Sequence, residues 1–304
     1  MMNDKTKSTL EKLKNKSKST GVDYQLLLQL LCQEEFLRRL SMSDYNNNFI
    51  LKGGLFIYLL SDFKSRVTVD MDFLLRNLSN DTMEIIECVK SILSTGSKYD
   101  FIDYEVLNVK QITLEKKYPG ISIQMIGKIG NTKTPVNIDF GIGDVVVPKP
   151  ETRIMRAQLS EFDDIKVKTY SLESTISEKF DAILQRFELT SRMKDFYDIW
   201  YLAVNYDFDG TVLSSAVKDT LNNRGTIFEV DSLDRVVRLA ENQTIMIRWH
   251  AFCLKMNIDL ELSECIDVLK ELLIPIVNSL LVGDMYTGIW VLKEVKWVEK
   301  SIKQ

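Results

Sequence analysis

The chain has 304 residues, of which 45% are hydrophobic and 27% are charged, and its formal net charge is −4. This composition is typical of a globular protein, and the acidic balance excludes a general nucleic-acid binder with a basic surface throughout. No apolar run is long enough to span a membrane and the start lacks the apolar region of a signal peptide, so we expect no membrane partner.

The cysteines and the single histidine narrow the chemistry further. No Cys-x-x-Cys pair is present, which favours reduced thiols in a cytoplasmic protein and indicates no zinc site. The four cysteines are Cys32, Cys88, Cys253 and Cys265. A histidine-based catalytic triad would depend on His250 alone, which argues against that chemistry.

The first predicted elements follow a lysine-rich start. We interpret this start as a solvated tail, with Lys5, Lys7, Lys12, Lys14, Lys16 and Lys18 against Asp4 and Glu11. Asp23 is the expected N-cap of a helix over residues 24–40, whose leucines share one face. We then predict a strand at 49–52, a glycine turn, a helix to about residue 60 and a strand at 66–75.

Two aspartates in the strand at 66–75 form the first part of a candidate site. Alternate residues of a strand share a face, so Asp70 and Asp72 should point the same way. Their neighbours should point into the core: Val69, Met71 and Phe73. Two adjacent carboxylates repel each other unless cations lie between them. Mg²⁺ suits such oxygen ligands, since it takes one or two carboxylates plus substrate phosphates.

The turn before this strand predicts a phosphate site. Gly53 and Gly54 join a strand to a helix, and the bare backbone N–H groups of such a junction attract phosphate. Carboxylates for a metal and a turn for phosphate together indicate a site that transfers a nucleotide.

Between residues 101 and 143 the pattern changes to strands. After a helix that begins at Asp81, weakly alternating strands at 104–109 and 111–114 precede a hairpin of 121–129 and 134–140. The second hairpin strand carries a third aspartate, Asp139. Lysines cluster around the hairpin, and a solvated strand face is the plainer interpretation of them: Lys110, Lys116, Lys117, Lys128 and Lys133.

A short strand at 165–168 should complete the sheet, and beyond residue 171 almost everything is predicted to be helical. The expected organisation is a mixed α/β lobe over 1–165, with helices at its start, followed by a helical lobe over 166–304. Thr190 or Ser191 should cap the second helix of the helical lobe. Trp290 and Trp297, seven residues apart, should form one stripe of a last helix at 290–302.

The helical lobe holds a second polar constellation. Lys179 and Arg186 are two turns apart on one predicted helix, and Arg192, Asp195 and Asp198 share a face of the next. One interpretation is an ion-pair web on a solvated helix hairpin. The other is functional, with Lys179 reaching a triphosphate as a point charge and Asp195 holding the lysine or the nucleotide.

These residues together resemble the AbiEii/AbiGii-type nucleotidyltransferase toxins of bacterial toxin–antitoxin and abortive-infection (phage-defence) operons. The resemblance covers about residues 49–202 and depends on five motifs: Lys52-Gly53-Gly54, Arg66-x-Thr68-x-Asp70-x-Asp72-Phe73, Asn137-Ile138-Asp139, Glu173-x₅-Lys179 and Lys194-Asp195-x-x-Asp198. It implies a polymerase-β-like nucleotidyltransferase fold, with a mixed-sheet lobe before a mostly helical lobe. It also implies Mg²⁺-dependent transfer from an NTP and a cytoplasmic antitoxin protein from the same operon. Some relatives modify the 3′ end of tRNA.

The resemblance assigns roles to the candidate residues. Asp70, Asp72 and Asp139 would be the metal ligands for two Mg²⁺ ions, with Asp139 activating the attacking hydroxyl and pyrophosphate as the leaving group. Lys179 and Asp195 would be a second nucleotide-contacting pair. The remaining nucleotide-binding candidates are Lys52, Gly53, Gly54, Arg66, Arg192 and Asp198.

One departure from the family concerns the phosphate turn. Many relatives have a threonine after the two glycines, but this chain has Leu55. With no hydroxyl expected there, phosphate would depend on backbone N–H groups, with Lys52 or Arg66 nearby.

Two other functions stay open from the sequence. A small-molecule nucleotidyltransferase of the antibiotic-modifying type would use the same site with another acceptor, and the acidic net charge favours it slightly. A degenerate nucleotide-binding or antitoxin-binding module is suggested by Leu55, but such a module would not need three carboxylates.

Overall fold

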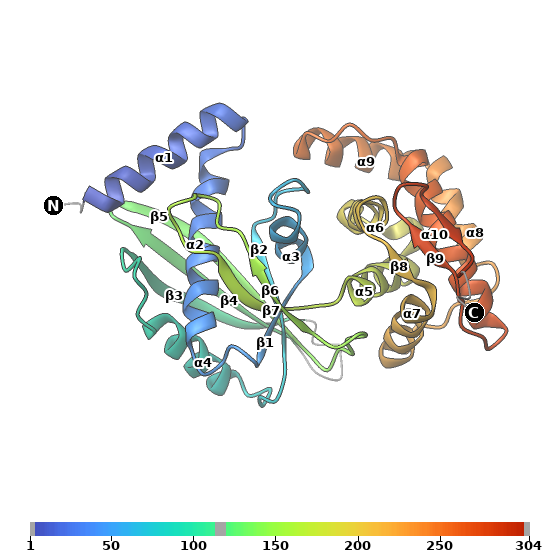
Figure 1. Ribbon diagram of the computed structural model, residues 1–304, viewed down its shortest axis with the longest axis horizontal. Helices are drawn as coiled ribbons and strands as arrows, with labels where there is room; N and C mark the ends of the chain where they lie inside the picture. Colours follow the sequence, from blue (N-terminus) through green and yellow to red (C-terminus); the bar gives the residue numbers. More distant parts are fainter. Residues whose placement is uncertain (1–3, 113–119, 301–304) are drawn as a thin grey trace. The chain divides into compact units, whose positions relative to one another are not determined.

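The computed structural model describes residues 4–112 and 120–300 (Figure 1). It divides into two compact units, which we describe separately. The first comprises Met1–Gly143 with Glu151–Thr169, and the second Asp144–Pro150 with Tyr170–Gln304. In the part of the chain that is described, no helix is long and apolar enough to cross a membrane. All four cysteines are buried and free.

The first unit is built on a mixed sheet of seven strands in the order β3-β4-β5-β2-β1-β7-β6. The strands are β1 Phe49–Lys52, β2 Asp70–Leu75, β3 Ile102–Ile112, β4 Gly120–Ile129, β5 Thr132–Ile142, β6 Glu151–Met155 and β7 Ile165–Thr169. The β2–β5 and β1–β7 pairs are parallel and the other pairs are antiparallel. The predicted mixed-sheet fold class is confirmed.

Helix α2 (Tyr24–Met42) packs on the sheet and begins where the sequence predicts. Asp23 caps it by accepting the N–H groups of Gln25 and Leu26. Its Phe36 ring lies 6.0 Å from the ring of Phe73 in β2, and an aromatic cluster continues through β1 and β5. This cluster is the core on the α2 side of the sheet.

The other helices of this unit are α1 (Asp4–Thr20), α3 (Gly53–Leu60) and α4 (Thr82–Ser94). Asp81 caps α4 as predicted. The interpretation of the start as a solvated tail is wrong, because α1 is a helix that packs on α2 (Figure 1). The buried residues that allow this are Thr6, Thr9 and Leu13.

The strand predictions need three corrections. The two weak strands are one strand, β3, with an irregularity between Val106 and Asn108 that obscures the alternation. The β4–β5 hairpin is confirmed, but its connection is only Gly130-Asn131, because Ile129 already pairs with Thr132. Strand β6 follows directly after Pro150 and was not predicted, because it shows little apolar alternation.

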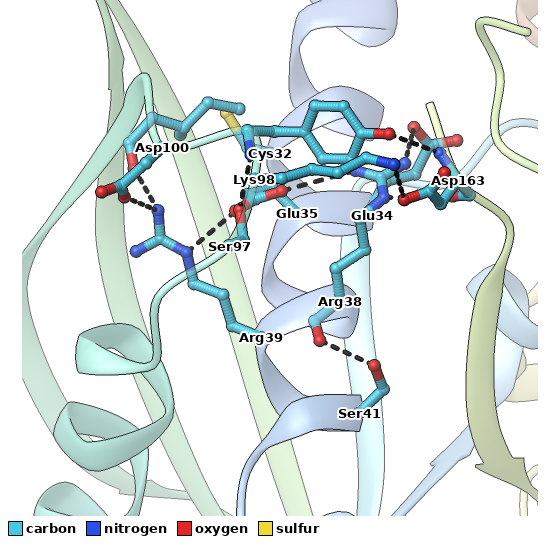
Figure 2. A network of polar contacts seen from close by, with 12 residues as sticks. Cys32, Glu34, Glu35, Arg38, Arg39, Ser41, Ser97, Lys98, Asp100 and Asp163 are labelled. Carbon is cyan, nitrogen blue, oxygen red and sulfur yellow. Dashed lines mark hydrogen bonds and ion pairs between the residues drawn. The ribbon is translucent and has the colours of Figure 1, made fainter. Parts of the chain in front are cut away.

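A buried charge network holds α2 in place within the first unit (Figure 2). Glu35 is fully buried, and its Oε1 lies 2.9 Å from Arg39 Nε and 2.5 Å from Ser97 Oγ. Glu34 is also fully buried and accepts the Gln158 N–H at 2.6 Å. Arg38 lies 3.5 Å from Glu34. The network fixes the helix behind the strands that carry the aspartates.

The ionisation of Glu34 should make the stability of the first unit depend on pH. Burial raises the pKa of Glu34 to about 7 in the folded protein, from its ordinary value of 4.5, although Arg38 and the Gln158 N–H oppose the shift. The folded state therefore binds more protons than the unfolded state between these values. We expect the free energy of unfolding to fall by about 3 kcal/mol as pH rises through this window.

Urea unfolding between pH 5 and 8 tests this, because Glu34→Gln should remove most of the decline. The matched control is Glu87→Gln, since Glu87 is an exposed glutamate paired with Lys90 on the surface of α4. The same decline in both variants would show that another group causes it.

The second unit is mostly helical. Its helices are α5 Leu172–Leu184, α6 Met193–Asn205, α7 Gly210–Arg224, α8 Ser232–Arg238, α9 Gln243–Met256 and α10 Leu262–Leu281, with short 3₁₀ turns at Phe187–Leu189 and Leu239–Glu241. A small sheet is formed by β8 (Phe208–Asp209), β9 (Ile289–Val291) and β10 (Lys296–Val298) in the order β10-β9-β8.

The predicted last helix at 290–302 is wrong, since its described residues form the β9–β10 hairpin. Trp290 and Trp297 are paired across the two strands, with ring centroids 5.5 Å apart. Their indole N–H groups donate to the carbonyls of Ala203 and Leu272. A spacing of seven residues fits one helix face or two facing strands, and these long-range contacts select the strands.

Candidate active site

The three predicted carboxylates lie on two neighbouring strands, β2 and β5. The parallel register pairs Asp72 with Asp139 and Asp70 with Asn137. Paired residues on adjacent strands project to the same face, and adjacent strands are about 4.8 Å apart. Asp72 and Asp139 are therefore neighbours, and Asp70 lies two residues away on the same face. All three side chains are partly exposed.

The residues that alternate with these aspartates are buried in the core: Met71, Phe73, Ile138 and Phe140. The prediction for Val69 is wrong, because its side chain is 40% exposed. The strand begins at Asp70 instead of residue 66. The Val69 carbonyl accepts hydrogen bonds from the side-chain amides of Gln29 and Gln33 at 3.1 and 2.9 Å. Side chains of α2 thus satisfy a carbonyl that a neighbouring strand would satisfy if β2 began earlier.

The row of residues that contains Asp72 and Asp139 continues onto the strands on either side. Lys52 of β1 pairs with Asp72, and Ser122 of β4 pairs with Asp139. A cationic and a hydroxyl side chain therefore flank the two carboxylates. Ser122 was not predicted, and only the register of the β4–β5 hairpin could have indicated it.

The glycine turn lies directly against Asp72. Gly53 has a φ of 70°, and a Cβ atom there would be 2.9 Å from the Asp72 Cγ and 3.0 Å from its Cβ. The chain enters α3 at this point, and Lys52 gives the helix no side-chain cap. The N-terminal N–H groups of a helix attract anions. The turn therefore places N–H groups of the kind that can hold a phosphate beside a carboxylate.

A hydroxyl group is present at the turn, contrary to the expectation from Leu55. A Cβ atom on Gly54 would be 3.0 Å from both Arg66 Nη2 and Thr68 Oγ1. Leu55 itself is fully buried. The segment before β2 thus supplies a guanidinium and a hydroxyl. The signal in the sequence was the alternation of Arg66, Thr68 and Asp70.

The contact between Gly53 and Asp72 gives a testable expectation for Gly53→Ala. The added methyl group would press on the Asp72 side chain, and a positive φ disfavours any residue with a Cβ by about 1–2 kcal/mol. We expect the variant to lose about that much unfolding free energy. Nucleotide transfer should fall further, because the displaced group is a catalytic candidate.

Gly96→Ala is the matched control, since a Cβ at Gly96 would meet nothing within 4 Å. We expect that variant to keep wild-type stability and transfer. Urea unfolding and a transfer assay on both proteins decide the point. Equal behaviour of the two variants would mean that the turn tolerates a side chain beside Asp72.

The second predicted constellation is assembled within the second unit by α5 and α6. Lys179 Nζ lies 3.3 Å from Asp195 Oδ1 and 2.5 Å from Asp198 Oδ2. Arg192 Nε lies 2.5 Å from Asp195 Oδ2. The side chains of both aspartates are 1% exposed and that of Lys179 is 10% exposed. Such burial is inconsistent with a solvated ion-pair web.

Two expectations about this helix pair are wrong. Arg186 is not on the helix of Lys179, because α5 ends at Leu184 and a 3₁₀ turn follows. The N-cap of α6 is Arg192 and not Thr190 or Ser191. Thr190 instead accepts the Arg192 N–H through its hydroxyl at 3.1 Å. The break between the helices is therefore longer than predicted.

A second ion network supports α5, and no sequence pattern indicated it. Arg224 of α7 lies 2.8 Å from Glu178, 3.0 Å from Asp181 and 3.0 Å from Asp144. Burial by itself would lower the pKa of Arg224, but the three carboxylates outweigh it and raise the pKa above its ordinary value. Since Glu178 precedes Lys179, this network helps to fix the helix turn that presents Lys179.

The carboxylates of the first unit suit Mg²⁺ in their chemistry. In residues 4–112 and 120–300, no three His, Cys, Asp or Glu side chains converge as a complete metal site. Mg²⁺ does not require one, because it is held by one or two carboxylates and completes its shell with water and substrate phosphate. Asp72 and Asp139, with Asp70 nearby, provide that donor set.

Known proteins share both the sequence pattern and the fold. A family model described as the nucleotidyl transferase AbiEii toxin of a type IV toxin–antitoxin system matches residues 35–271. No curated protein matches the chain. Among solved structures, MenT4, a nucleotidyltransferase toxin from Mycobacterium tuberculosis, has a TM-score of 0.50 and 17% identity, over 86% of this chain and 94% of that chain.

Two structures from Helicobacter pylori are also similar. A predicted nucleotidyltransferase has a TM-score of 0.48 and 14% identity, over 81% of this chain and 91% of that chain. The protein JHP933 has a TM-score of 0.45 and 15% identity, over 93% of this chain and 99% of that chain. At identities this low, a similar structure shows a shared fold and nothing more.

Proposed function

Since the chain belongs to the AbiEii nucleotidyltransferase toxin family of type IV toxin–antitoxin systems, we propose that it transfers nucleotides from an NTP to the 3′-terminal hydroxyl of tRNA. Nucleotidyltransferase activity follows from the family. The proposal adds three things to this activity: tRNA as the acceptor, a pair of Mg²⁺ ions, and a role in phage defence. The observation that supports it best is the pairing of Asp72 with Asp139, directly beside the Gly53 turn.

The residues of the first unit fit the parts of such a reaction. The acceptor oxygen would form a bond to the α-phosphorus. The bond between the α-phosphorus and the oxygen that bridges it to the β-phosphate would break, and pyrophosphate would leave. Asp139 would orient the acceptor hydroxyl and take its proton. The Gly53–Gly54 backbone, with Arg66 and Thr68 beside it, would hold the phosphates.

Asp70, Asp72 and Asp139 would hold the Mg²⁺ ions, which when bound stabilise charge on the attacking and leaving oxygens. In the second unit, Lys179 would contact the nucleotide as a point charge, with Asp195 and Asp198 holding its ammonium group in one position. Arg192 would act with them through Asp195. These roles follow the family motifs position by position.

A toxin of this family implies an antitoxin partner. We propose that this partner is a protein encoded in the same operon. Co-expression of the neighbouring gene should restore growth to cells that are inhibited by this chain.

Incubation with each labelled NTP, Mg²⁺ and total RNA tests the proposal directly. We expect a labelled band of tRNA size, and its loss after periodate oxidation of the RNA, which destroys the 3′ diol. Label in a small molecule with none in RNA would move the function to the small-molecule class, which the net charge of −4 favours. No product with any NTP would support the binding module without catalysis.

A further inference from the structure

Helix α1 presents a row of lysines on its outer face. Lys7, Lys14 and Lys18 are exposed, whereas the residues that α1 buries are Thr6, Thr9 and Leu13. Intervals of seven and four residues keep the three lysines within about 40° of one another around the helix axis. The row is about 16 Å long at 1.5 Å per residue. Over this length one strand of a nucleic-acid duplex presents several phosphates.

The charge of α1 contrasts with the rest of the chain. The helix has six lysines against Asp4 and Glu11 in a protein whose formal net charge is −4. A polyanion would be repelled by the remaining, more acidic residues. Its approach therefore requires a local positive surface, and α1 is such a surface. Within α1, the acidic residues near the lysine row are Glu11, between Lys7 and Lys14, and Asp4, one turn before Lys7.

Five of the six lysines of α1 fall into two groups with different contacts. Lys12 pairs with Glu161 at 2.7 Å, and Lys16 donates to the Gln158 carbonyl at 2.7 Å. In the described part of the chain, Lys7, Lys14 and Lys18 form no ion pair, although Lys14 lies 6.0 Å from the Tyr24 ring. One group thus anchors the helix and the other remains available to a ligand.

The hairpin lysines are a weaker candidate for the same role. Lys128 is paired with Glu105 at 2.7 Å, so its charge is already compensated. Lys116 and Lys117 lie outside the described residues. Lys110 and Lys133 are exposed, but Lys133 acts on Glu105 as well, so the α1 row keeps more lysines whose charge is uncompensated.

The chemistry of the row favours a nucleic acid over a lipid surface or a protein. None of the large hydrophobic side chains exposed on the described residues belongs to α1. An interfacial membrane helix needs an apolar face, and the buried centre of a protein interface is apolar as well. Contacts with a sugar–phosphate backbone need only charge and hydrogen-bond donors.

Contacts within the first unit connect α1 to the candidate active site. Lys16 Nζ lies 5.1 Å from the ring of Phe63, which closely follows α3. The same helix α3 begins at Gly53, beside Asp72. Helix α2, onto which α1 leads (Figure 1), donates two hydrogen bonds to the carbonyl directly before Asp70. The lysine row and the carboxylates are therefore linked through elements that contact one another within the first unit.

We propose that the face of α1 formed by Lys7, Lys14 and Lys18 binds the sugar–phosphate backbone of the RNA acceptor. The inference rests on the proposed function for the identity of the acceptor as RNA. Each lysine would release condensed counterions when it neutralises a phosphate, so binding through this face should weaken steeply with salt.

The test compares a triple variant, Lys7→Gln, Lys14→Gln and Lys18→Gln, with the unmodified protein. Glutamine keeps helix propensity close to that of lysine, and circular dichroism checks the fold. The probe is labelled, deacylated tRNA at salt concentrations from about 50 to 300 mM. We expect the Kd at low salt to rise about 10- to 100-fold, and the slope of log Kd against log salt to decrease by about 2–3.

A control variant loses the same charge elsewhere, by Lys149→Gln, Lys166→Gln and Lys255→Gln, all at exposed lysines. It should keep the wild-type Kd and slope. Equal Kd values and slopes in the two variants would overturn the proposal. Failure of the unmodified protein to bind tRNA would also overturn it. So would a triple variant that no longer binds phosphatidylglycerol vesicles but binds tRNA as well as the unmodified protein does.

Nucleotide transfer is measured separately, so that the two proposals can fail independently. Transfer at saturating tRNA should be little changed in the triple variant, while KM for tRNA rises. If tRNA binding depends on the three lysines but neither the unmodified protein nor the variants transfer a nucleotide, the α1 site is supported and the proposed function is refuted. Transfer to tRNA with an unchanged KM in the triple variant would refute the α1 site alone.

Discussion

Asp72→Asn is expected to abolish nucleotide transfer while the protein stays folded. Asp72 pairs in register with both Lys52 and Asp139, and it contacts the Gly53 turn. Asparagine has nearly the same shape but carries no negative charge, so it is a poor ligand for Mg²⁺. Loss of one such electrostatic contribution should reduce kcat by about 10²–10³-fold or more. Stability should be unchanged or slightly higher, because repulsion from Asp139 and Asp70 is relieved.

Asp103→Asn is the matched control for this experiment. Asp103 is an exposed aspartate of the same sheet, on β3, where it pairs in register with Lys128. We expect full transfer by that variant and full growth inhibition on expression. Transfer of labelled NTP to RNA and growth of the expressing cells are the two measurements. An Asp72→Asn protein with wild-type activity would exclude Asp72 from the metal site.

Lys179→Met should cause the largest loss of stability among the site variants. The substitution removes an ammonium that is 3.3 Å from Asp195 and 2.5 Å from Asp198, two carboxylates that are almost completely buried. Removal of one partner from a buried ion pair typically costs about 3–5 kcal/mol, because the other charge stays buried. We expect a loss of this size in unfolding free energy. NTP use should be lost as well if Lys179 contacts the triphosphate.

Two further variants separate these effects. Asp198→Asn in the Lys179→Met background removes one of the buried negative charges and should recover part of the stability. Arg186→Met is the matched control, because Arg186 is exposed beyond the end of α5 and its loss should change stability by less than about 0.5 kcal/mol. Similar urea midpoints for Lys179→Met and Arg186→Met would show that the buried cluster contributes little to stability.

Much of the candidate site could be predicted because its signals are short-range. Alternation along a strand places Asp70 and Asp72 on one face, whatever the rest of the fold does. Asp23 and Asp81 cap their helices as expected, because capping joins a side chain to N–H groups two or three residues away. The family motifs add the order of these elements, and the family match confirms that part of the interpretation.

The errors occur where a local pattern is compatible with two structures. The spacing of Trp290 and Trp297 fits a helix or a hairpin, and hydrogen bonds to Ala203 and Leu272 decide for the hairpin. The lysine-rich start is polar enough to have been a solvated tail. It is a helix because three small or apolar side chains find a partner in α2. In both cases the deciding contacts are with another element of the fold, outside the local pattern.

The sequence by itself determined the candidate carboxylates, the glycine turn, the mixed-sheet class and the family. Only the tertiary structure decided that Asp139 is beside Asp72, that Thr68 brings a hydroxyl to Gly54, and that Lys179 is buried between two aspartates. The physical reason is the distance along the sequence over which each interaction acts. Side-chain alternation and capping depend on residues a few positions apart, whereas the choice of neighbouring strand and the burial of a charge depend on how the whole chain excludes water.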